Sequence, residues 1–407
     1  MSVTRVAPAH RPRLDNRGQM VVLVLLSLVL TGAALRTVDL GTRGYFIPDE
    51  DISIKSGNYF LLGNATGYGL KFVNGTLDLT WPHPYNYEHP PLGKIFIGVS
   101  GLAFGHTAAG YRLLGALLGT ALVVLVFLLA RKFMSNSWAL VPAAVASFDP
   151  LLVQLSRVAT PDIYFLFFAV SAFVAFIYLR GLKGVTAAGI LMGMSVASKW
   201  LGLYALLALL LYQLISGRVS ANRLLAPIAT ILIAAGVYVA SYFEYFIGGP
   251  VYQIGAPAPS YLLLGPHTFP DFVQLQLWMA QFTLSWHVAG TSYGYVFMST
   301  LTYVLPGVST APIYAFDIAL FGAVPLAALA YLSRTRPPSL LVLWCLSGLI
   351  PLFDQGFVWY LAYEIPGAAL LMAWFASSFQ TETKLVRLIP VLLLVGEAVV
   401  FLSYLPR

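Results

Sequence analysis

This sequence contains few charged residues and a single cysteine. Only 10% of its 407 residues are charged, whereas an average soluble domain is about a quarter charged. The single cysteine, Cys345, excludes a disulfide framework and a cysteine-based metal site. In their place the chain is 59% hydrophobic, with apolar runs such as 20–35 and 113–130. This composition predicts an integral membrane protein rather than a soluble one.

Apolar runs of spanning length recur along the whole chain. Counting those that approach the ~17–25 residues needed to cross a bilayer predicts about eleven transmembrane helices. We therefore expect an all-α polytopic fold, with residues 1–407 forming a single membrane domain and the two termini on opposite faces. The predicted spans are residues 20–36, 112–133, 137–155, 161–180, 184–199, 201–217, 224–247, 313–333, 338–353, 357–377 and 385–405.

Basic residues distinguish the two faces. The N-terminal tail, residues 1–19, contains four Lys or Arg, and five later turns contain two each, together 14 of the 23 in the chain. Because cytoplasmic segments collect Lys and Arg, we expect a cytoplasmic N-terminus and an extracellular or luminal C-terminus. The net charge of +7 is then a topology signal, and nucleic-acid binding is not favoured. The five turns contain Arg131/Lys132, Arg180/Lys183, Arg218/Arg223, Arg334/Arg336 and Lys384/Arg387.

Two outer segments, 37–111 and 248–312, are too long to be simple connections. The first contains apolar stretches too short to span, such as 95–104, which we expect to lie along the membrane interface. Loops longer than ~15 residues are usually functional or disordered, and the aromatic content of both segments favours function. The second predicts a helix with one apolar face, made of Phe272, Leu275, Met279, Phe282 and Trp286.

Polar residues gather at the outer ends of the spans and in these two segments. Each alone has an ordinary interpretation, such as solvated loop charge or a snorkelling arginine. Lys199 is harder to explain, because it divides two apolar runs and a cation near hydrocarbon costs ~2.5–3.5 kcal/mol on insertion scales. The set consists of Asp49, Glu50, His89, Lys94, Arg112, Arg157, Asp162 and Lys199.

The predicted topology places all these groups on one face, which predicts a chamber that opens outward. Cations near headgroup depth suit a phosphate carried on a lipid, and a carboxylate suits a base that takes the proton of an attacking hydroxyl. The combination indicates group transfer from a lipid phosphate. The alternative of a secondary transporter or flippase would favour charges near the middle of the membrane and matching broken helices in two halves.

Several segments resemble, in the same order, the dolichyl-phosphate-mannose protein O-mannosyltransferases, a family of polytopic C-type glycosyltransferases. "PDED" (48–51) resembles the Asp-Glu pair of the first outer loop, and "EHPPLGK" (88–94) resembles a His-Pro-Pro-Leu-Gly-Lys segment. Further along, the resemblance continues in "YRLLGALLGT" (111–120), "LLVQLSRVATPDIYFLFF" (151–168) and "GMSVASKWLGL" (193–203), and less tightly in "SWHVAGTSYGYVFMS" (285–299) and "WYLAYEIPGAALLMA" (359–373).

The resemblance implies that a hexose, with mannose favoured, passes with inversion from a dolichyl or polyprenyl phosphate to Ser/Thr hydroxyls of a protein at the outer face. It implies that Asp49 is the general base and Glu50 its positioning neighbour, and that His287 lies on the acceptor side. It also implies that Asp162 orients Arg157, and it requires neither a metal nor another cofactor. The residues it implies for the donor phosphate and sugar are His89, Lys94, Arg112, Arg157, Asp162, Lys199 and Trp200.

The chain departs from the family in ways that leave the acceptor open. The second outer loop has no room for the soluble β-rich domain of eukaryotic members, and "SYGY" stands where the family has a His-Pro-Tyr element. A sugar or aminosugar transferase that acts on a lipid or glycan is the main alternative. An oligosaccharyltransferase is less favoured, because the Trp-Trp-Asp-Tyr-Gly signature is missing.

Overall fold

The computed structural model describes residues 16–41, 48–62, 71–73, 76–78, 89–216, 224–247, 267–288, 338–354 and 361–378. Within these ranges the chain is helical apart from one small antiparallel sheet, in which β1 pairs with β2. The elements are α1 (Asn16–Thr37), α2 (Pro48–Leu62), β1 (Lys71–Val73), β2 (Thr76–Asp78), α3 (Leu92–Phe104), α4 (Ala108–Ala130), α5 (Asn136–Phe148), α6 (Pro150–Ser156), α7 (Asp162–Tyr178), α8 (Gly181–Ser198), α9 (Gly202–Ser216), α10 (Leu225–Ser241), α11 (Phe243–Ile247), α12 (Phe269–Val288), α15 (Ser339–Asp354) and α16 (Leu361–Ser378).

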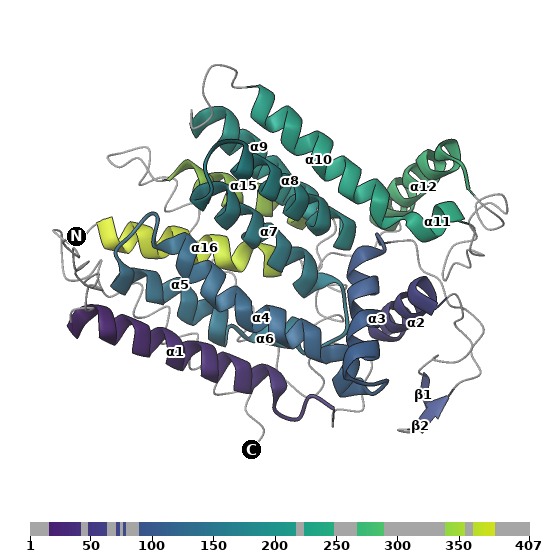
Figure 1. Ribbon diagram of the computed structural model, residues 1–407, viewed down its shortest axis with the longest axis horizontal. Helices are drawn as coiled ribbons and strands as arrows, with labels where there is room; N and C mark the ends of the chain where they lie inside the picture. Colours follow the sequence, from purple (N-terminus) through teal and green to yellow (C-terminus); the bar gives the residue numbers. More distant parts are fainter. Residues whose placement is uncertain are drawn as a thin grey trace, which may run out of the picture.

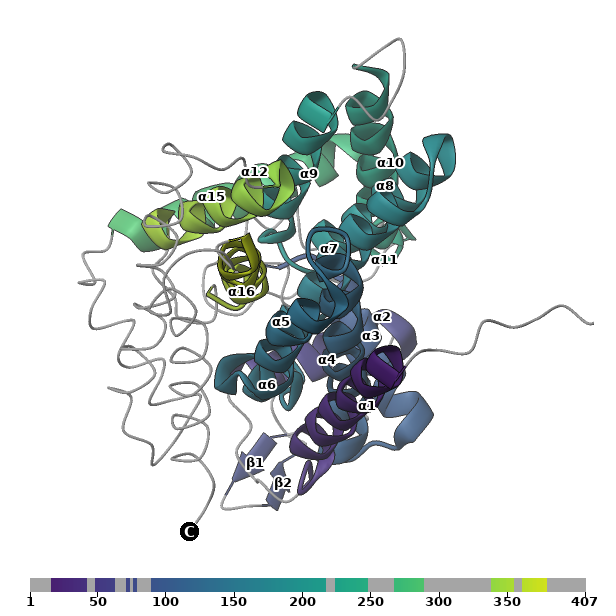
Figure 2. The same cartoon turned by 90° about the vertical axis from the view of Figure 1, so that its left-hand side faces the viewer.

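The long helices lie roughly alongside one another in a bundle. Figure 1 shows α1 along the lower edge and α10 along the upper edge, with α4, α5, α7 and α8 between them. Helices α15 and α16 pack against α9 and α5 respectively, and Figure 2 shows both on one side of the bundle. Helices α2, α3, α11 and α12 collect at one end, which is the right-hand end in Figure 1.

Three helices, α1, α4 and α8, are long and apolar enough to cross a membrane, and α5 with α6 forms a further candidate that is bent by 55°. Shorter apolar helices include α7, α9 and α10. The predicted spans from 20–36 to 224–247 all coincide with helices, as do 338–353 and most of 357–377. The predicted spans 313–333 and 385–405 lie outside the described residues, so the count of eleven stays a prediction.

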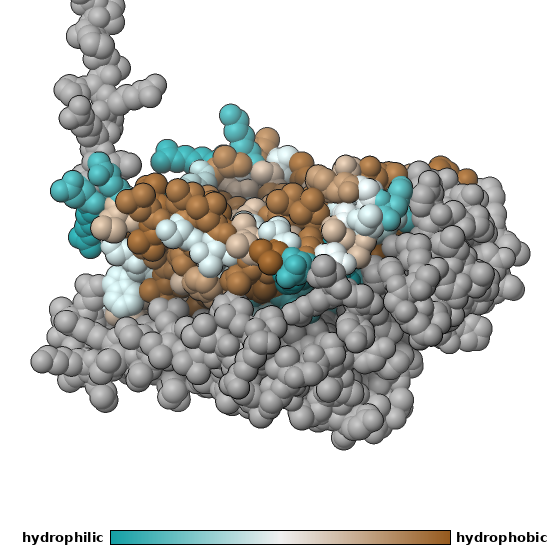
Figure 3. Space-filling model, turned by 90° about the horizontal axis from the view of Figure 1, so that it is seen from below, coloured by the Kyte–Doolittle hydropathy of each residue, from teal (hydrophilic) through white to brown (hydrophobic). Residues whose placement is uncertain are grey.

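The outside of the bundle is apolar where a membrane protein contacts lipid. Along α1, Met20, Leu23, Leu26 and Leu30 are each more than half exposed. Figure 3, which views the molecule from below, shows a broad apolar band on this side. Because so much exposed apolar surface is unfavourable in water, these helices indicate an integral membrane protein.

The predicted span 137–155 is not one continuous helix, because it breaks between α5 and α6 with a bend of 55°. Pro150 lacks an amide hydrogen and disfavours a helical conformation in the residue before it. Asp149 instead caps α6, accepting a hydrogen bond from the Leu152 amide at 2.8 Å. The buried Arg36 of α1 satisfies carbonyl groups at the end of α5, donating to Ala146 O at 2.7 Å and Ser147 O at 2.9 Å.

The two predicted outer helices are present. The apolar stretch 95–104 lies within α3, and the predicted amphipathic helix of the second outer segment is α12. Phe272, Leu275 and Met279 are buried, as their spacing predicts, in one cluster with Tyr242 and Tyr245 from the α10–α11 region. Phe282 and Trp286 have side chains outside the described part of the structure. Helix α12 therefore packs onto the same end of the bundle as α2 and α3.

Candidate active site

A buried ion pair joins the first turn of α2 to the second turn of α4. Arg112 donates through Nε to Glu50 Oε1 at 2.6 Å and through Nη2 to Glu50 Oε2 at 2.9 Å. The third arm of the guanidinium, Nη1, donates to Leu40 O at 2.9 Å. Both side chains are almost completely buried. Bidentate pairing with satisfied remaining donors is the arrangement in which a buried ion pair is stable.

Glu50 also holds the turn between α6 and α7. Its Oε1 accepts a hydrogen bond from the backbone amide of Ala159 at 2.8 Å. In the same turn, Arg157 is half-buried and donates through Nη1 to Leu35 O, just before the end of α1. One carboxylate therefore ties together α2, α4 and the turn that the sequence analysis singled out.

A second buried ion pair lies at the other end of that turn. Lys199, which caps the C-terminus of α8, donates through Nζ to Asp162 Oδ1 at 2.6 Å. Asp162 is the first residue of α7, and both side chains are buried. Asp162 therefore pairs with a residue 37 positions further along the chain, while the expectation that it orients Arg157 stays a prediction. The ion pair gives a charged partner to the lysine that divides two apolar runs.

The two ion pairs form one unit because both depend on residues 157–162. The backbone amide of Ala159 donates a hydrogen bond to Glu50, and Asp162, three residues later, accepts one from Lys199. Fixing both ends of a short turn restricts its backbone and the side chains it carries, including Arg157. The structure thus brings Glu50, Arg112, Asp162 and Lys199 to one end of the bundle, as the predicted chamber requires.

The segment "HPPLGK" packs against the same turn. A Cβ added at Gly93, in the first turn of α3, would lie 2.9 Å from Pro161 Cβ and 3.3 Å from Ser198 O. A side chain there would therefore separate α3 from the turn and from the end of α8. Lys94, the next residue, is buried and donates through Nζ to His89 O at 3.1 Å.

The pKa of His89 is affected by the charges of two lysines, Lys199 and Lys94. Burial lowers the pKa of His89 well below its usual value of 6.5, and the positive charges of Lys199 and Lys94 lower this pKa further. His89 is therefore neutral near pH 7, and its ring can donate or accept a hydrogen bond. The histidine, Lys94 and Lys199 concentrate positive charge and polar groups where α3 begins and α8 ends.

Two residues that sequence reasoning missed connect Trp200 to the second outer segment. Trp200 Nε1 donates to Tyr238 OH at 2.8 Å, and Tyr238 OH donates to Gln276 Oε1 at 2.6 Å. Among the described residues, the buried amide nitrogen of Gln276, Nε2, has no hydrogen-bond partner. A tyrosine within a predicted span and a glutamine in a predicted amphipathic helix gave no local sign of this contact. Only the packing of α12 onto α10 brings them together.

Asp49 and His287, two predicted site residues, and the buried Lys55 also lie on helices α2 and α12. Asp49 lies in the first turn of α2, directly before Glu50, and His287 lies in the last turn of α12. The side chains of both lie outside the described part of the structure. Lys55 of α2 is also buried, and sequence reasoning missed it because "SIKSGNY" resembles a polar loop.

Sequence comparison finds a family to which the centre of the chain is similar. Residues 88–243 match the model of the dolichyl-phosphate-mannose-protein mannosyltransferase family. Polyprenol-phosphate-mannose--protein mannosyltransferase of Mycolicibacterium smegmatis is 29% identical over 203 residues, which is 39% of this chain and 39% of that protein. The protein of the same name from Mycobacterium tuberculosis is 32% identical over 146 residues, which is 29% of this chain and 28% of that protein.

Solved structures share the fold. The archaeal oligosaccharyltransferase AglB from Archaeoglobus fulgidus, in complex with an inhibitory peptide and a dolichol-phosphate, aligns with a TM-score of 0.56 at 14% identity, over 95% of this chain and 56% of that one. ArnT from Cupriavidus metallidurans, bound to undecaprenyl phosphate, aligns with a TM-score of 0.54 at 14% identity, over 95% of this chain and 71% of that one. These likenesses show that the chain shares the helical fold of these two proteins.

The matched segment and the site overlap closely. Asp49, Glu50 and His287 lie outside the matched segment, residues 88–243. The predicted site residues inside it are His89, Lys94, Arg112, Arg157, Asp162, Lys199 and Trp200. The resemblance predicted from the sequence is therefore confirmed: through residues 88–243, this chain is similar to the dolichyl-phosphate-mannose-protein mannosyltransferases.

Proposed function

We propose that this protein transfers a mannosyl group from a polyprenyl-phosphate-mannose donor to Ser or Thr hydroxyls of a protein acceptor. The observation that carries the proposal is the pair of buried ion pairs, Glu50–Arg112 and Asp162–Lys199, which converge on residues 157–162. The similarity of residues 88–243 to protein mannosyltransferases supports the choice of sugar and acceptor.

Asp49 is the general base of the proposal. Both oxygens of the neighbouring Glu50 already accept hydrogen bonds, from Arg112 and from Ala159. A carboxylate so occupied is a positioning group rather than a proton acceptor, since proton abstraction requires an available oxygen within hydrogen-bond reach of the hydroxyl. Glu50 fixes the first turn of α2, and Asp49 on that turn takes the proton of the attacking hydroxyl.

Lys199 is the principal cation for the donor phosphate. The bond to Asp162 Oδ1 holds its ammonium group in place beside the turn. Arg157 lies on the restrained turn, and Lys94 and the neutral His89 lie where α3 begins. Because the leaving phosphate is already a stabilised anion, fixed cations and polar hydrogens are sufficient to receive its charge. Arg112, which is engaged by Glu50, positions this site instead of binding the phosphate.

The whole chain is proposed to be a single membrane domain that holds this site at the outer face. In this arrangement eleven spans cross the membrane, residues 1–19 are cytoplasmic, and 37–111 and 248–312 are outer segments. Trp200 supports the sugar side of the site through Tyr238, and His287 at the end of α12 is on the acceptor side. Attack from the side opposite the phosphate inverts the configuration at the sugar carbon.

Transfer assays in membranes test the function. Membranes that contain the full chain are incubated with labelled polyprenyl-phosphate-mannose and a Ser/Thr-rich peptide, and label is counted in the peptide and lipid fractions. The proposal predicts labelled peptide that is lost in Asp49→Asn and retained in the adjacent control Asp51→Asn. Label in lipid alone would favour a lipid-acting transferase, which is the main alternative for this fold. Equal labelling by wild type and Asp49→Asn would remove Asp49 as the base.

A further inference from the structure

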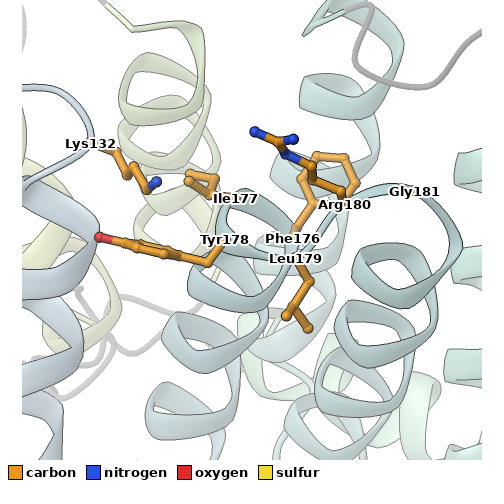
Figure 4. A pocket seen from close by; sticks show the side chains of 7 residues that line it. All are labelled: Lys132, Phe176, Ile177, Tyr178, Leu179, Arg180 and Gly181. Atoms are coloured by element: carbon orange, nitrogen blue, oxygen red, sulfur yellow. The ribbon is translucent and has the colours of Figure 1, made fainter. Parts of the chain in front are cut away.

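A second polar site lies at the opposite end of the bundle from the ion pairs. It is a pocket of about 470 Å³ where the turn after α4 meets the connection from α7 to α8 (Figure 4). Nothing in the proposed transfer reaction uses it. Its lining residues are Lys132, Phe176, Ile177, Tyr178, Leu179, Arg180 and Gly181.

The helices themselves place this pocket at the other membrane boundary. Helix α7 begins at Asp162 in the candidate active site and ends at Tyr178 in the pocket. With 17 residues at a rise of about 1.5 Å each, it is roughly 25 Å long, close to the thickness of the hydrocarbon layer. Helix α4 likewise runs from Arg112 to the turn that contains Lys132. The pocket therefore lies on the face that the basic turns predict to be cytoplasmic.

The pocket is positively charged, and none of its seven lining residues is acidic. Lys132 and Arg180 reach it from two different turns, and Figure 4 shows their charged ends on either side of Ile177. Lys132 Nζ lies 3.8 Å from the centre of the Tyr178 ring. The ring is fixed in turn because Tyr178 OH donates to Leu128 O at 2.7 Å. A cation held over an aromatic face and a second across the pocket favour an anionic ligand.

The surroundings of the pocket are apolar and open to the lipid. Leu179 is 44% exposed, and Leu182, just beyond the pocket, is 75% exposed. Phe176 and Ile177 form apolar wall next to the two cations. A ligand that matches the charged pocket and its apolar surroundings has an anionic group that contacts the two cations. It also has hydrocarbon chains that contact the exposed leucines.

We propose that this pocket binds the phosphate headgroup of an anionic phospholipid of the cytoplasmic leaflet. The phosphate lies between Lys132 and Arg180, and the acyl chains run along the exposed apolar residues at the junction of α7 and α8. Basic turns attract anionic lipids in general. What distinguishes this one is a pocket of headgroup size with a lysine held in place by Tyr178.

The test is native mass spectrometry of the purified full chain with phosphatidylglycerol or phosphatidylcholine added in graded amounts. Wild type should retain phosphatidylglycerol in preference to phosphatidylcholine. The double variant Lys132→Gln/Arg180→Gln should weaken retention about tenfold. Arg131→Gln/Lys183→Gln is the matched control, because it removes the same charge from the same two turns. Arg131 and Lys183 do not line the pocket, and Arg131 is engaged by Asn136 Oδ1 at 3.1 Å, so the control should retain the lipid.

Three results would overturn the proposal. Equal weakening in both double variants would mean that surface charge alone attracts the lipid, and unchanged retention in Lys132→Gln/Arg180→Gln would mean that the pocket is not used. Equal binding of glycerol 3-phosphate, which has no acyl chains, would mean that the site takes a free phosphate. The charge-preserving variant Lys132→Arg/Arg180→Lys should retain the lipid, which separates loss of charge from loss of folding.

Discussion

Glu50 and Arg112, 62 positions apart in the sequence, are joined by two hydrogen bonds in a buried contact. Glu50 uses the same carboxylate to hold Ala159. In the proposed mechanism, this contact leaves proton transfer to Asp49 rather than Glu50. In the same proposal Arg112 positions the site and does not bind the phosphate.

Removing one member of the Glu50–Arg112 pair should destabilise the fold strongly. Glu50→Ala or Arg112→Ala leaves a buried charge without its partner, which costs about 3–5 kcal/mol. The double variant Glu50→Ala/Arg112→Ala should lose less than the two single losses added together, because it leaves no unpaired charge. Thermal unfolding in detergent measures all three. Additive losses would show that the pair does not couple.

Lys199→Gln should raise the KM for the donor and leave the KM for the acceptor unchanged. Losing a charge-assisted contact to the phosphate should raise the KM for polyprenyl-phosphate-mannose about tenfold or more. Steady-state kinetics with each substrate varied in turn measures this change. The control is Lys183→Gln, at the opposite end of the same helix α8, which should leave both KM values unchanged. A rise confined to the acceptor KM would contradict the phosphate role of Lys199.

Tyr238→Phe tests whether Tyr238 positions Trp200. The variant removes the hydroxyl that bonds to Trp200, Gln276 and Tyr242, and we expect kcat/KM to fall about tenfold. In a Trp200→Phe background the same substitution should have a smaller effect, because one of these three contacts is already absent. Full additivity of the two variants would place Tyr238 outside the function of Trp200.

Gly93→Ala tests the close packing of α3 against the turn. The added methyl group would lie 2.9 Å from Pro161 Cβ, and overpacking of this kind costs about 1–3 kcal/mol. Gly236→Ala in α10 is the matched control, because an added Cβ there would have no atom of another described segment within 4 Å. Thermal unfolding and transfer activity should both fall in Gly93→Ala and stay at the wild-type level or above in Gly236→Ala.

His89 should make the stability of the fold depend on pH. Its folded-state pKa is lowered well below 6.5, so the unfolded chain takes up a proton first as the pH falls. Stability that is present above pH 6.5 is therefore lost as the pH falls below that value. Thermal unfolding at about pH 7.5 and about pH 5.5 should show a larger loss for wild type than for His89→Gln. An identical loss in both proteins would contradict this effect.

The sequence predicted best the features that depend on local composition. Lys199 is conspicuous in the sequence because it interrupts apolar residues, and the fold gives it a buried partner. The apolar face of α12 follows from helical spacing, and Phe272, Leu275 and Met279 are buried as expected. Such patterns are visible in a single segment because burial repeats with the helical period.

The features that sequence reasoning missed depend on contacts between distant segments. Asp162 was considered only beside Arg157, its neighbour in the turn, whereas the fold also brings Lys199 to it from 37 positions away. The break at Asp149 was not expected, because the apolar composition continues through it and the compensating Arg36 comes from another helix. Tyr238 and Gln276 meet only through the packing of α12. Local pattern alone does not contain these pairings.

The central claim is that Lys199 and the turn 157–162 receive the phosphate of the lipid donor. An experimental structure of the full chain with bound polyprenyl phosphate tests this claim most directly. The account predicts a phosphate oxygen within about 3.2 Å of Lys199 Nζ, with Asp49 on the same side of the membrane. A phosphate found away from Lys199 and Arg157, or at the end of the bundle that contains Lys132, would contradict it.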